Sequence, residues 1–334
     1  WHPDGRDACL IQDVLDLIEY ANGDARRTVW GRKRAEAGHP KPFNLKYIGI
    51  GNEDMITEVF EERFAMIYKA VREKHPEITV VGTVGPFYEG TDYAEGWRLA
   101  TELGVPMVDE HYCVDPGWMI HNQDYYDRYD RTKSKVYLGE YAAHLPGRPN
   151  NIETALAEAL YLTSVERNAD VVRLATYAPL FAHVDAWQWN PDLIWFDNLR
   201  MMRTPNYYVQ QMYGMNAGTD VLNLQMDGKP VTGQDSLYAS AVLDAPTGEV
   251  ILKLVNAGSR SEKVQIEFSG LKKRQLVSGS CTYLQSDDWK AKNTLEQEAI
   301  VPRIRPVEVA SRSLSLELQP RSFGVYRLRI STQS

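Results

Sequence analysis

The sequence predicts two fold classes in one chain, an α/β region followed by an all-β region. Short apolar runs alternate with segments of helical spacing up to about residue 213. The expected strands begin near residues 47, 78, 107, 136 and 171, so the starts lie 31, 29, 29 and 35 residues apart. This spacing is about the length of one strand–helix repeat with parallel strands. Five such units fit either an α/β barrel or a doubly wound sheet.

The α/β region begins with an amphipathic helix. Apolar residues from Leu10 to Ala21 step by three and four, and Asn22 and Gly23 supply a stop. A polar, basic loop follows, and then the apolar run Tyr47–Gly51 predicts a strand before a helix over 56–71. The same alternation predicts strands at 78–81, 105–109, 136–138 and 171–176, helices at 93–103 and 152–167, and tyrosine-rich segments at 125–129 and 207–213.

The second region is predicted to be a β-sandwich. Short β-rich runs, separated by clusters of Gly, Ser, Asp and Asn, are typical of this architecture. The runs are Leu237–Val242, Val250–Val255, Val264–Phe268, Leu314–Leu318 and Val325–Ile330. The change of pattern places the boundary near 215–222, and we divide the chain into domains at 1–218 and 219–334.

Length, charge and composition exclude several classes of protein. The 334 residues correspond to roughly two domains, and 43% apolar residues are enough to form sizeable cores. The formal net charge of −8, with no long run of like charges, disfavours nucleic acid as a partner. No apolar stretch approaches the roughly 20 residues that a membrane crossing requires. Eight Trp and nineteen Tyr suit the flat faces of sugars, although this hint is weak alone.

Two glutamates stand at equivalent places in the repeat. Glu53 in YIGIGNED and Glu140 in KVYLGEYA each lie at the C-terminal end of an expected strand, three repeats apart. Barrel enzymes collect their catalytic groups at these strand ends. Two carboxylates that converge on one bond meet the requirement for glycoside hydrolysis, one as acid and the other as nucleophile. A lone glutamate at a strand end is usually an ordinary charged residue, so the hypothesis depends on the pair.

The ordered segments YIGIGNED, DEHYC, VYLGEYA and AWQWNPDLIWFDN resemble the C-terminal part of family 51 glycoside hydrolases, the α-L-arabinofuranosidases. The resemblance runs from about Leu10 to the C-terminus. It implies a (β/α)8 barrel, of which only strands 4–8 are present, followed by a jelly-roll-like sandwich. It also implies a retaining hydrolase that removes terminal arabinofuranosyl residues from plant glycans, with Glu53 as acid/base after strand four and Glu140 as nucleophile after strand seven.

Further site residues follow from the same resemblance. Asn52 is expected to hydrogen-bond a sugar hydroxyl, with a strand-end turn as the alternative. His111 and Tyr112 match the family's His-Tyr pair, and Tyr112 is expected to orient the nucleophile unless it only packs at the rim. Glu110 is left outside the core site.

The loop after the strand at 171–176 supplies a candidate sugar-binding wall. Trp187 and Trp189 would stack on sugar faces, with a polar contact from Asn190, unless the tryptophans merely seal the barrel mouth. No metal or other cofactor is expected, because two carboxylates suffice for this reaction and the histidines lack paired ligand spacing.

The repeat count predicts that the barrel is incomplete. A barrel needs eight strands, and an open arc of five would expose apolar faces and strand edges. We therefore expect an N-terminal segment or a companion chain to complete it, and we expect this chain alone to be inactive. Homo-oligomerisation is a further expectation. An extracellular or periplasmic location is slightly favoured.

Two other functions stay open at this stage. An endoglucanase or β-xylosidase would use the same paired glutamates, with an extended cleft for polymer backbones. A carbohydrate-binding protein on the same fold would orient sugars with these glutamates without cleaving them, because fold alone does not determine activity.

Overall fold

The computed structural model describes residues 6–332 of the chain, which form two compact units. The first unit runs to Tyr112 and includes Asp130–Gly139 and Arg173–Ala175. The second contains Cys113–Tyr129, Glu140–Val172 and the residues from Thr176 onward. The predicted domain boundary at 218/219 stays a prediction.

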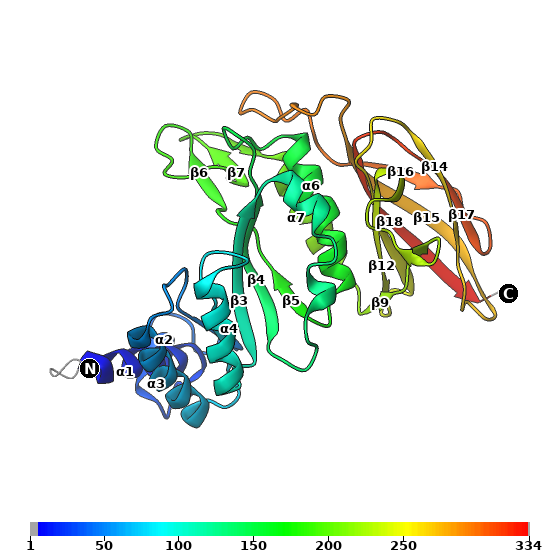
Figure 1. Cartoon of the computed structure of the whole chain (residues 1–334). Helices are drawn as coiled ribbons and strands as arrows, with labels where there is room; N and C mark the ends of the chain where they lie inside the picture. The colour runs from blue at the N-terminus through cyan, green and yellow to red at the C-terminus, as the bar shows by residue number, and fades with distance from the viewer. Residues whose placement is uncertain (1–5, 333–334) are drawn as a thin grey trace. The chain divides into compact units, whose positions relative to one another are not determined.

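The first unit contains most of a sheet of five strands in the order β1-β2-β3-β4-β5 (Figure 1), while the last residues of β3 and β4 and the first of β5 belong to the second unit. The strands are β1 (Tyr47–Ile50), β2 (Thr79–Thr83), β3 (Met107–Val114), β4 (Lys135–Ala143) and β5 (Val172–Ala175). β1 pairs with β2 and β2 with β3 in parallel. Spatial order that follows chain order is typical of a barrel wall, whereas a doubly wound sheet reverses its order at a switch point. The expected arc of five barrel strands is therefore confirmed.

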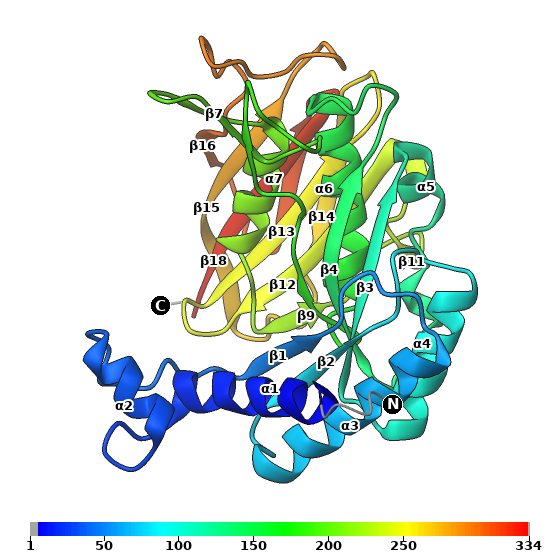
Figure 2. The same cartoon turned by 90° about the vertical axis from the view of Figure 1, so that its left-hand side faces the viewer.

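Four helices accompany these strands: α1 (Arg6–Asn22), α2 (Val29–Glu36), α3 (Glu58–Lys74) and α4 (Thr91–Leu103). Figure 2 shows α1 beside α2 and α3, which it contacts. α3 begins at Thr57, whose hydroxyl accepts the Phe60 N–H, and buries Phe64, Tyr68 and Val71. α4 ends at Gly104 in the left-handed conformation that glycine adopts without strain.

Helix α2 corrects the expectation of a loop between the first helix and the first strand. Its N-cap Thr28 accepts the Gly31 N–H at 3.1 Å. The fully buried Arg34 donates to the carbonyls of Tyr20, His39 and Pro40. The cap and the buried arginine hold this helix, and its residues show no apolar periodicity. A prediction based on periodicity therefore misses it.

The second unit contains α5 (Pro116–His121), the 3-10 turn η1 (Tyr126–Arg128), α6 (Ile152–Arg167) and α7 (Pro205–Gly214). α6 is buried along almost its whole length and contacts α5, α7 and the sandwich strands β12 and β13. Asn151 caps it in a reciprocal box with Thr154. A small sheet of β6 (Phe181–His183), β7 (Ile194–Phe196) and β8 (Met201–Arg203) was not expected, because three-residue strands are too short to show periodicity.

The predicted β-sandwich is confirmed, and it is richer in strands than the sequence indicated. Its larger sheet has the order β16-β15-β18-β13-β12-β9, and β14 pairs with β17 in a second sheet. The strands, including a short β10–β11 hairpin, are β9 (Asp220–Leu222), β10 (Gln225–Met226), β11 (Lys229–Pro230), β12 (Leu237–Asp244), β13 (Glu249–Asn256), β14 (Glu262–Glu267), β15 (Arg274–Gln285), β16 (Arg303–Val307), β17 (Ser313–Leu318) and β18 (Ser322–Thr332).

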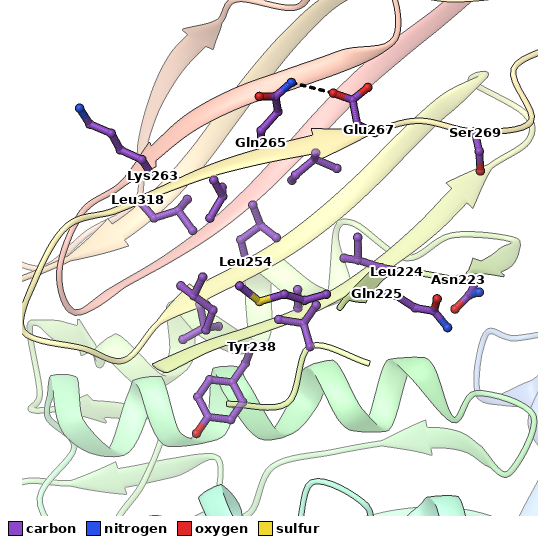
Figure 3. A pocket seen from close by; sticks show the side chains of 17 residues that line it. Asn223, Leu224, Gln225, Tyr238, Leu254, Lys263, Gln265, Glu267, Ser269 and Leu318 are labelled. Atoms are coloured by element: carbon purple, nitrogen blue, oxygen red, sulfur yellow. Dashed lines mark hydrogen bonds between the residues drawn. The ribbon is translucent and has the colours of Figure 1, made fainter. Parts of the chain in front are cut away.

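A cavity of about 550 Å³ opens between the two sheets of the sandwich, lined by Leu224, Leu254 and Leu318 among others (Figure 3). Gln265 and Glu267 lie on β14 at its rim and bond each other at 2.7 Å. The sandwich core is therefore continuous but open at this point.

None of the helices within residues 6–332 is both long and apolar enough to cross a membrane.

Candidate active site

The loop after β1 carries Asn52 and Glu53 in the first unit. Gly51 has a φ of 87°, and a Cβ there would lie 2.5 Å from the Thr83 methyl group, so glycine is required. The Asp54 carboxylate accepts the Asn52 N–H at 2.7 Å. The Thr83 hydroxyl donates to the Asn52 carbonyl and accepts the Gly85 N–H. The side chains of Asp54 and Thr83 thus hold the backbone of the loop, while the Glu53 side chain is 46% exposed.

The imidazole of His111 contacts two carboxyl groups, those of Glu53 and Asp109. The Nδ1 of His111 lies 3.2 Å from Glu53 Oε1, and its Nε2 lies 3.1 Å from Asp109 Oδ2. The His111 side chain is 3% exposed, so it cannot exchange these partners for water. A neutral imidazole carries one N–H. If Nε2 donates to Asp109, Nδ1 is left to accept a proton from Glu53, and protonated Glu53 is the form that a general acid requires.

Gly139 ties this network to the predicted nucleophile. The carboxylate of Asp109 occupies the space that a Cβ on Gly139 would need. Glycine is therefore the residue that fits on β4 at this point. Glu140 is the next residue in the chain, so the contact that fixes Gly139 also fixes the backbone entering Glu140.

The end of β4 in the second unit is buried and closely held. Tyr141, Ala142 and Ala143 are fully buried, and the Tyr141 hydroxyl donates to Gln210 at 2.6 Å. The Ala143 N–H donates to the fully buried Glu158 on α6 at 3.0 Å. Burial raises the pKa of Glu158 to about 8, although hydrogen bonds from Ala143 and Asn206 act in the opposite direction.

The remaining predicted residues of the first unit have distinct environments. The Asn52 side chain is exposed, and its backbone lies in the bend that follows β1. Tyr112 is 1% exposed and lies edge-on to Tyr88, with ring centroids 6.4 Å apart. Glu110 is buried and accepts the Trp97 indole N–H at 3.1 Å.

The predicted aromatic wall lies in the second unit. Trp187 and Trp189 are 49% and 44% exposed, so both offer ring surface to a ligand. Trp187 packs against Trp195. The guanidinium of Arg148 lies 4.3 Å from the Trp189 ring centroid, and the ring of His144 lies 6.2 Å away.

The loop that follows β4 is joined to this wall. The Asn190 amide donates to the Gly147 carbonyl, and Arg148 donates to the Asn190 carbonyl, both at 3.4 Å. Burial and the nearby Arg148 charge lower the pKa of His144 to about 4, so its ring is neutral near pH 7. The structure therefore brings Trp189 and Asn190 together with the loop that follows β4.

Sequence reasoning missed Asp109, Gly139, Arg148 and Glu158. Asp109 could have been found, because it precedes His111 by two residues and so shares its face of the strand. Gly139 was noted only as a neighbour of Glu140. The role of Glu158 depends on which face α6 turns toward β4, and spacing does not show that.

Comparison with known structures defines the class of fold. The arabinose-bound MgGH51 α-L-arabinofuranosidase is 25% identical, and the match covers 98% of this chain and 52% of that chain with a TM-score of 0.84. The α-L-arabinofuranosidase from Thermotoga maritima in its arabinose complex gives a TM-score of 0.71 at 19% identity, covering 95% of this chain and 73% of that chain. The barrel strands and the sandwich are thus shared with glycoside hydrolases.

Sequence comparison then gives the family. The model for the α-L-arabinofuranosidase C-terminal domain matches residues 123–322, and the model for the α-L-arabinofuranosidase 1 domain matches residues 5–131. An extracellular exo-α-L-arabinofuranosidase from Streptomyces chartreusis is 40% identical over 86% of this chain and 35% of its own length. Alpha-L-arabinofuranosidase 1 from Arabidopsis thaliana is 32% identical over 96% of this chain and 46% of its own length. The chain belongs to the family 51 α-L-arabinofuranosidases.

The chain spans about a third to a half of the length of the curated relatives that it matches. The family resemblance seen in the four sequence segments is confirmed.

Proposed function

We propose that the protein containing this chain removes terminal α-L-arabinofuranosyl residues from arabinose-containing plant oligosaccharides or polysaccharides with retention of configuration. Glu53 acts as acid/base and Glu140 as nucleophile. The observation that carries the proposal is the His111–Asp109 pair, which contacts Glu53 on one side and Gly139, the neighbour of Glu140, on the other. Family membership and the arabinose complexes of two structural relatives support the choice of sugar.

The first step forms a covalent intermediate. The ionised Glu140 carboxylate attacks the anomeric carbon while the bond from that carbon to the leaving oxygen breaks. Protonated Glu53 gives its proton to the leaving oxygen, which departs as an alcohol. His111 donates its own N–H from Nε2 to Asp109. Until the proton is transferred to the leaving oxygen, Nδ1 accepts a hydrogen bond from the protonated Glu53 carboxyl group.

The second step releases arabinose. Glu53, now ionised, removes a proton from a water molecule, whose oxygen attacks the anomeric carbon and displaces Glu140. Two inversions restore the original configuration. Retaining glycosidases place the two carboxyl groups about 5–5.5 Å apart, so we expect this separation in the complete enzyme.

Other residues are proposed to bind the sugar. Asn52, with its side chain exposed beside Glu53, would bond a hydroxyl. Tyr112 would orient the nucleophile through its phenol. Trp187, Trp189 and Asn190 would form the wall that contacts the arabinosyl unit or its neighbour, and their half-exposed rings support this assignment.

A further polypeptide segment is proposed to complete the barrel. β1 and β5 are the two outer strands of the sheet. Tyr47 on β1 is 45% exposed, and Leu174 on β5 is 41% exposed. Exposed edge strands with apolar residues are a liability unless another segment covers them. That segment would belong to the same longer protein or to a companion chain, and homo-oligomers are part of the proposal. The Streptomyces relative is named extracellular, and we propose an extracellular location for this protein.

Azide rescue tests the two glutamate roles separately. The chain is assayed together with the rest of its barrel, with p-nitrophenyl α-L-arabinofuranoside as substrate. Glu140→Ala is expected to lose about 10³-fold or more of kcat, and azide restores turnover with an inverted β-arabinofuranosyl azide as product. Glu53→Ala still forms the intermediate from this activated substrate, and azide then gives the retained α-azide.

The azide anomer and the sugar that is released distinguish the proposed function from its alternatives. The same azide anomer from both variants, or unchanged turnover in Glu140→Ala, contradicts the assignment. Release of xylose or glucose units in place of arabinose would indicate another glycosidase. Residues 1–334 alone, folded but inactive, support the requirement for a completed barrel, whereas full turnover by this chain overturns it.

A further inference from the structure

A second cavity lies in the second unit beside the aromatic wall, with a volume of about 410 Å³. Three segments line it: the loop after β4, the small sheet, and the loop between β15 and β16. The lining residues used below are Arg148, Asn150, Asn190, Trp195, Lys292 and Glu296. The volume lies within the range of small-molecule sites, about 300–1,000 Å³.

The far wall of this cavity is held in place by buried hydrogen bonds. Asn293 is 3% exposed and donates to the carbonyls of Arg203 at 2.9 Å and Ile300 at 2.8 Å. Its side-chain oxygen accepts the Ile300 N–H at 2.8 Å. The Ile152 N–H, at the start of α6, donates to the Ala291 carbonyl. The loop at 291–300 is therefore fixed before any ligand arrives, which lowers the cost of binding.

The cavity carries two cations without a carboxylate partner in the described part of the chain, Arg148 and Lys292. Arg148 stacks on Trp189 and gives one N–H to the Asn190 carbonyl. A guanidinium has five donors, so others stay available. Glu296 also lines the cavity, but it lies 3.5 Å from Arg200. Two such cations in one cavity are notable in a chain whose net charge is −8.

The neutral groups around these cations suit a sugar. The Asn150 amide donates to the Tyr177 hydroxyl and accepts the Asp192 N–H, and the Asn190 amide donates to the Gly147 carbonyl. An amide has two N–H donors and two acceptor lone pairs, so both keep further capacity for a sugar hydroxyl, and Trp195 provides an aromatic face. A neutral sugar would use these groups and leave both cations without a counter-charge. A sugar that carries a carboxylate would also pair with the cations, because arginine binds carboxylates through paired N–H donors.

We propose that this cavity binds a uronic acid unit of the glycan and so selects acidic oligosaccharides. The inference deepens the proposed function, on which it rests, because Asn190 belongs both to this cavity and to the proposed sugar-binding wall. The acid would stand on the substrate backbone or on a neighbouring branch. Glucuronic acid and galacturonic acid share the recognised carboxylate.

The test is calorimetric binding to the chain together with the rest of its barrel. The probes are a glucuronic acid-substituted xylotriose, a galacturonic acid trimer and neutral xylotriose. We expect the better acidic probe to bind about 10-fold more tightly than the neutral one, with the preference decreasing as salt increases. Equal affinities of acidic and neutral probes overturn the inference, and the two acidic arms identify which uronic acid is preferred.

Two lysines on the same loop provide a matched pair of variants. Lys292→Gln is expected to weaken binding of the acidic probe about 3–10-fold and to leave xylotriose binding unchanged. Lys290→Gln removes the same charge outside the cavity and is expected to change both affinities less than about 2-fold. An equal loss in both variants would show only a general charge effect and contradict the inference. Competition by inorganic sulfate at fixed ionic strength would show a general anion site and overturn it as well.

Hydrolysis of the neutral p-nitrophenyl arabinofuranoside is measured in parallel on the unmodified protein. Turnover without any preference for acidic probes overturns the inference and leaves the proposed function standing. Selective binding of acidic probes without turnover contradicts the proposed function and leaves a uronic acid site.

Discussion

The two segments that carry the proposed catalytic glutamates, the loop after β1 and the last part of β4, differ in how they are held. After β1, side-chain contacts from Thr83 and Asp54 to the backbone hold an exposed loop, and Glu53 itself is 46% exposed. After Glu140, β4 continues through three fully buried residues and is bonded by a fully buried carboxyl group on α6. One glutamate stands on a loop, and the other at the start of a buried segment.

This difference matches the two proposed roles. A nucleophile must meet one carbon atom along one line, so a rigid backbone favours attack. An acid/base has to exchange its proton with a leaving group and then with water, so it needs access to solvent.

The largest expected effect comes from Gly139→Ala. The new Cβ would meet the Asp109 carboxylate and displace the backbone that enters Glu140. We expect a loss of about 10²-fold or more in kcat and of about 1–3 kcal/mol in unfolding free energy. Kinetics and chemical denaturation measure both. Gly49→Ala is the control, because nothing lies within 4 Å of a Cβ on that strand residue of β1. Equal effects of the two changes would contradict the role of the Asp109 contact.

Asp109→Asn is expected to have the second-largest effect, a loss of about 10–100-fold in kcat. An amide can donate to His111 Nε2, which moves the imidazole proton to Nδ1 and removes the acceptor for protonated Glu53. The loss should therefore be larger for substrates with poor leaving groups than for nitrophenyl glycosides, and the pH profile of kcat should change shape. A uniform loss with all leaving groups would indicate a structural role instead.

Glu158→Gln tests the buried side of the comparison. The folded-state pKa of about 8 lies above the ordinary 4.5, so the stability linked to this group is complete below about pH 4.5 and is lost as pH rises through 8. Gln is always neutral, and after an amide flip Asn206 Oδ1, which lacks a partner in the described part of the chain, can accept its N–H. We expect the variant to be more stable than the unmodified chain at pH 8, by roughly 1–3 kcal/mol, and to have a melting temperature less sensitive to pH. If the melting temperatures of both proteins changed by the same amount between pH 5 and pH 8, this prediction would be refuted.

Thr83→Val has the smallest expected effect. It removes the hydroxyl that bonds the Asn52 carbonyl and the Gly85 N–H while preserving the shape of the side chain. We expect a loss of about 1 kcal/mol in stability and a few-fold change in kcat/KM. A loss as large as that of Gly139→Ala would mean that the β1 loop is as rigidly required as β4, and the contrast between the two strand ends would disappear.

The sequence predicted the repeating architecture because buried parallel strands and amphipathic helices leave regular apolar spacing. It placed Glu53 and Glu140 at strand ends from that spacing: Glu53 does follow β1, whereas Glu140 lies within β4, three residues before its end, because β4 is longer than its apolar run indicated. Their catalytic roles stay predictions. It failed for α2, which Arg34 stabilises, and for the three-residue strands β6, β7 and β8. Asp109 lies two residues before His111 and could have been found on that basis. Glu158 was missed because its partners Ala143 and Asn206 lie 15 and 48 residues away along the chain, and local spacing does not encode such contacts.

Helix α6 carries two carboxyl groups that bond different parts of the molecule. Glu158 bonds β4, the strand that carries Glu140, while Glu166, two turns later, bonds Ser240 and the fully buried Lys253 of the sandwich. Removing one partner of a buried ion pair leaves an uncompensated charge. A chimera in which another β-domain replaces the sandwich would leave Glu166 without its cation, so we expect such a chimera to need a substitution at Glu166 as well.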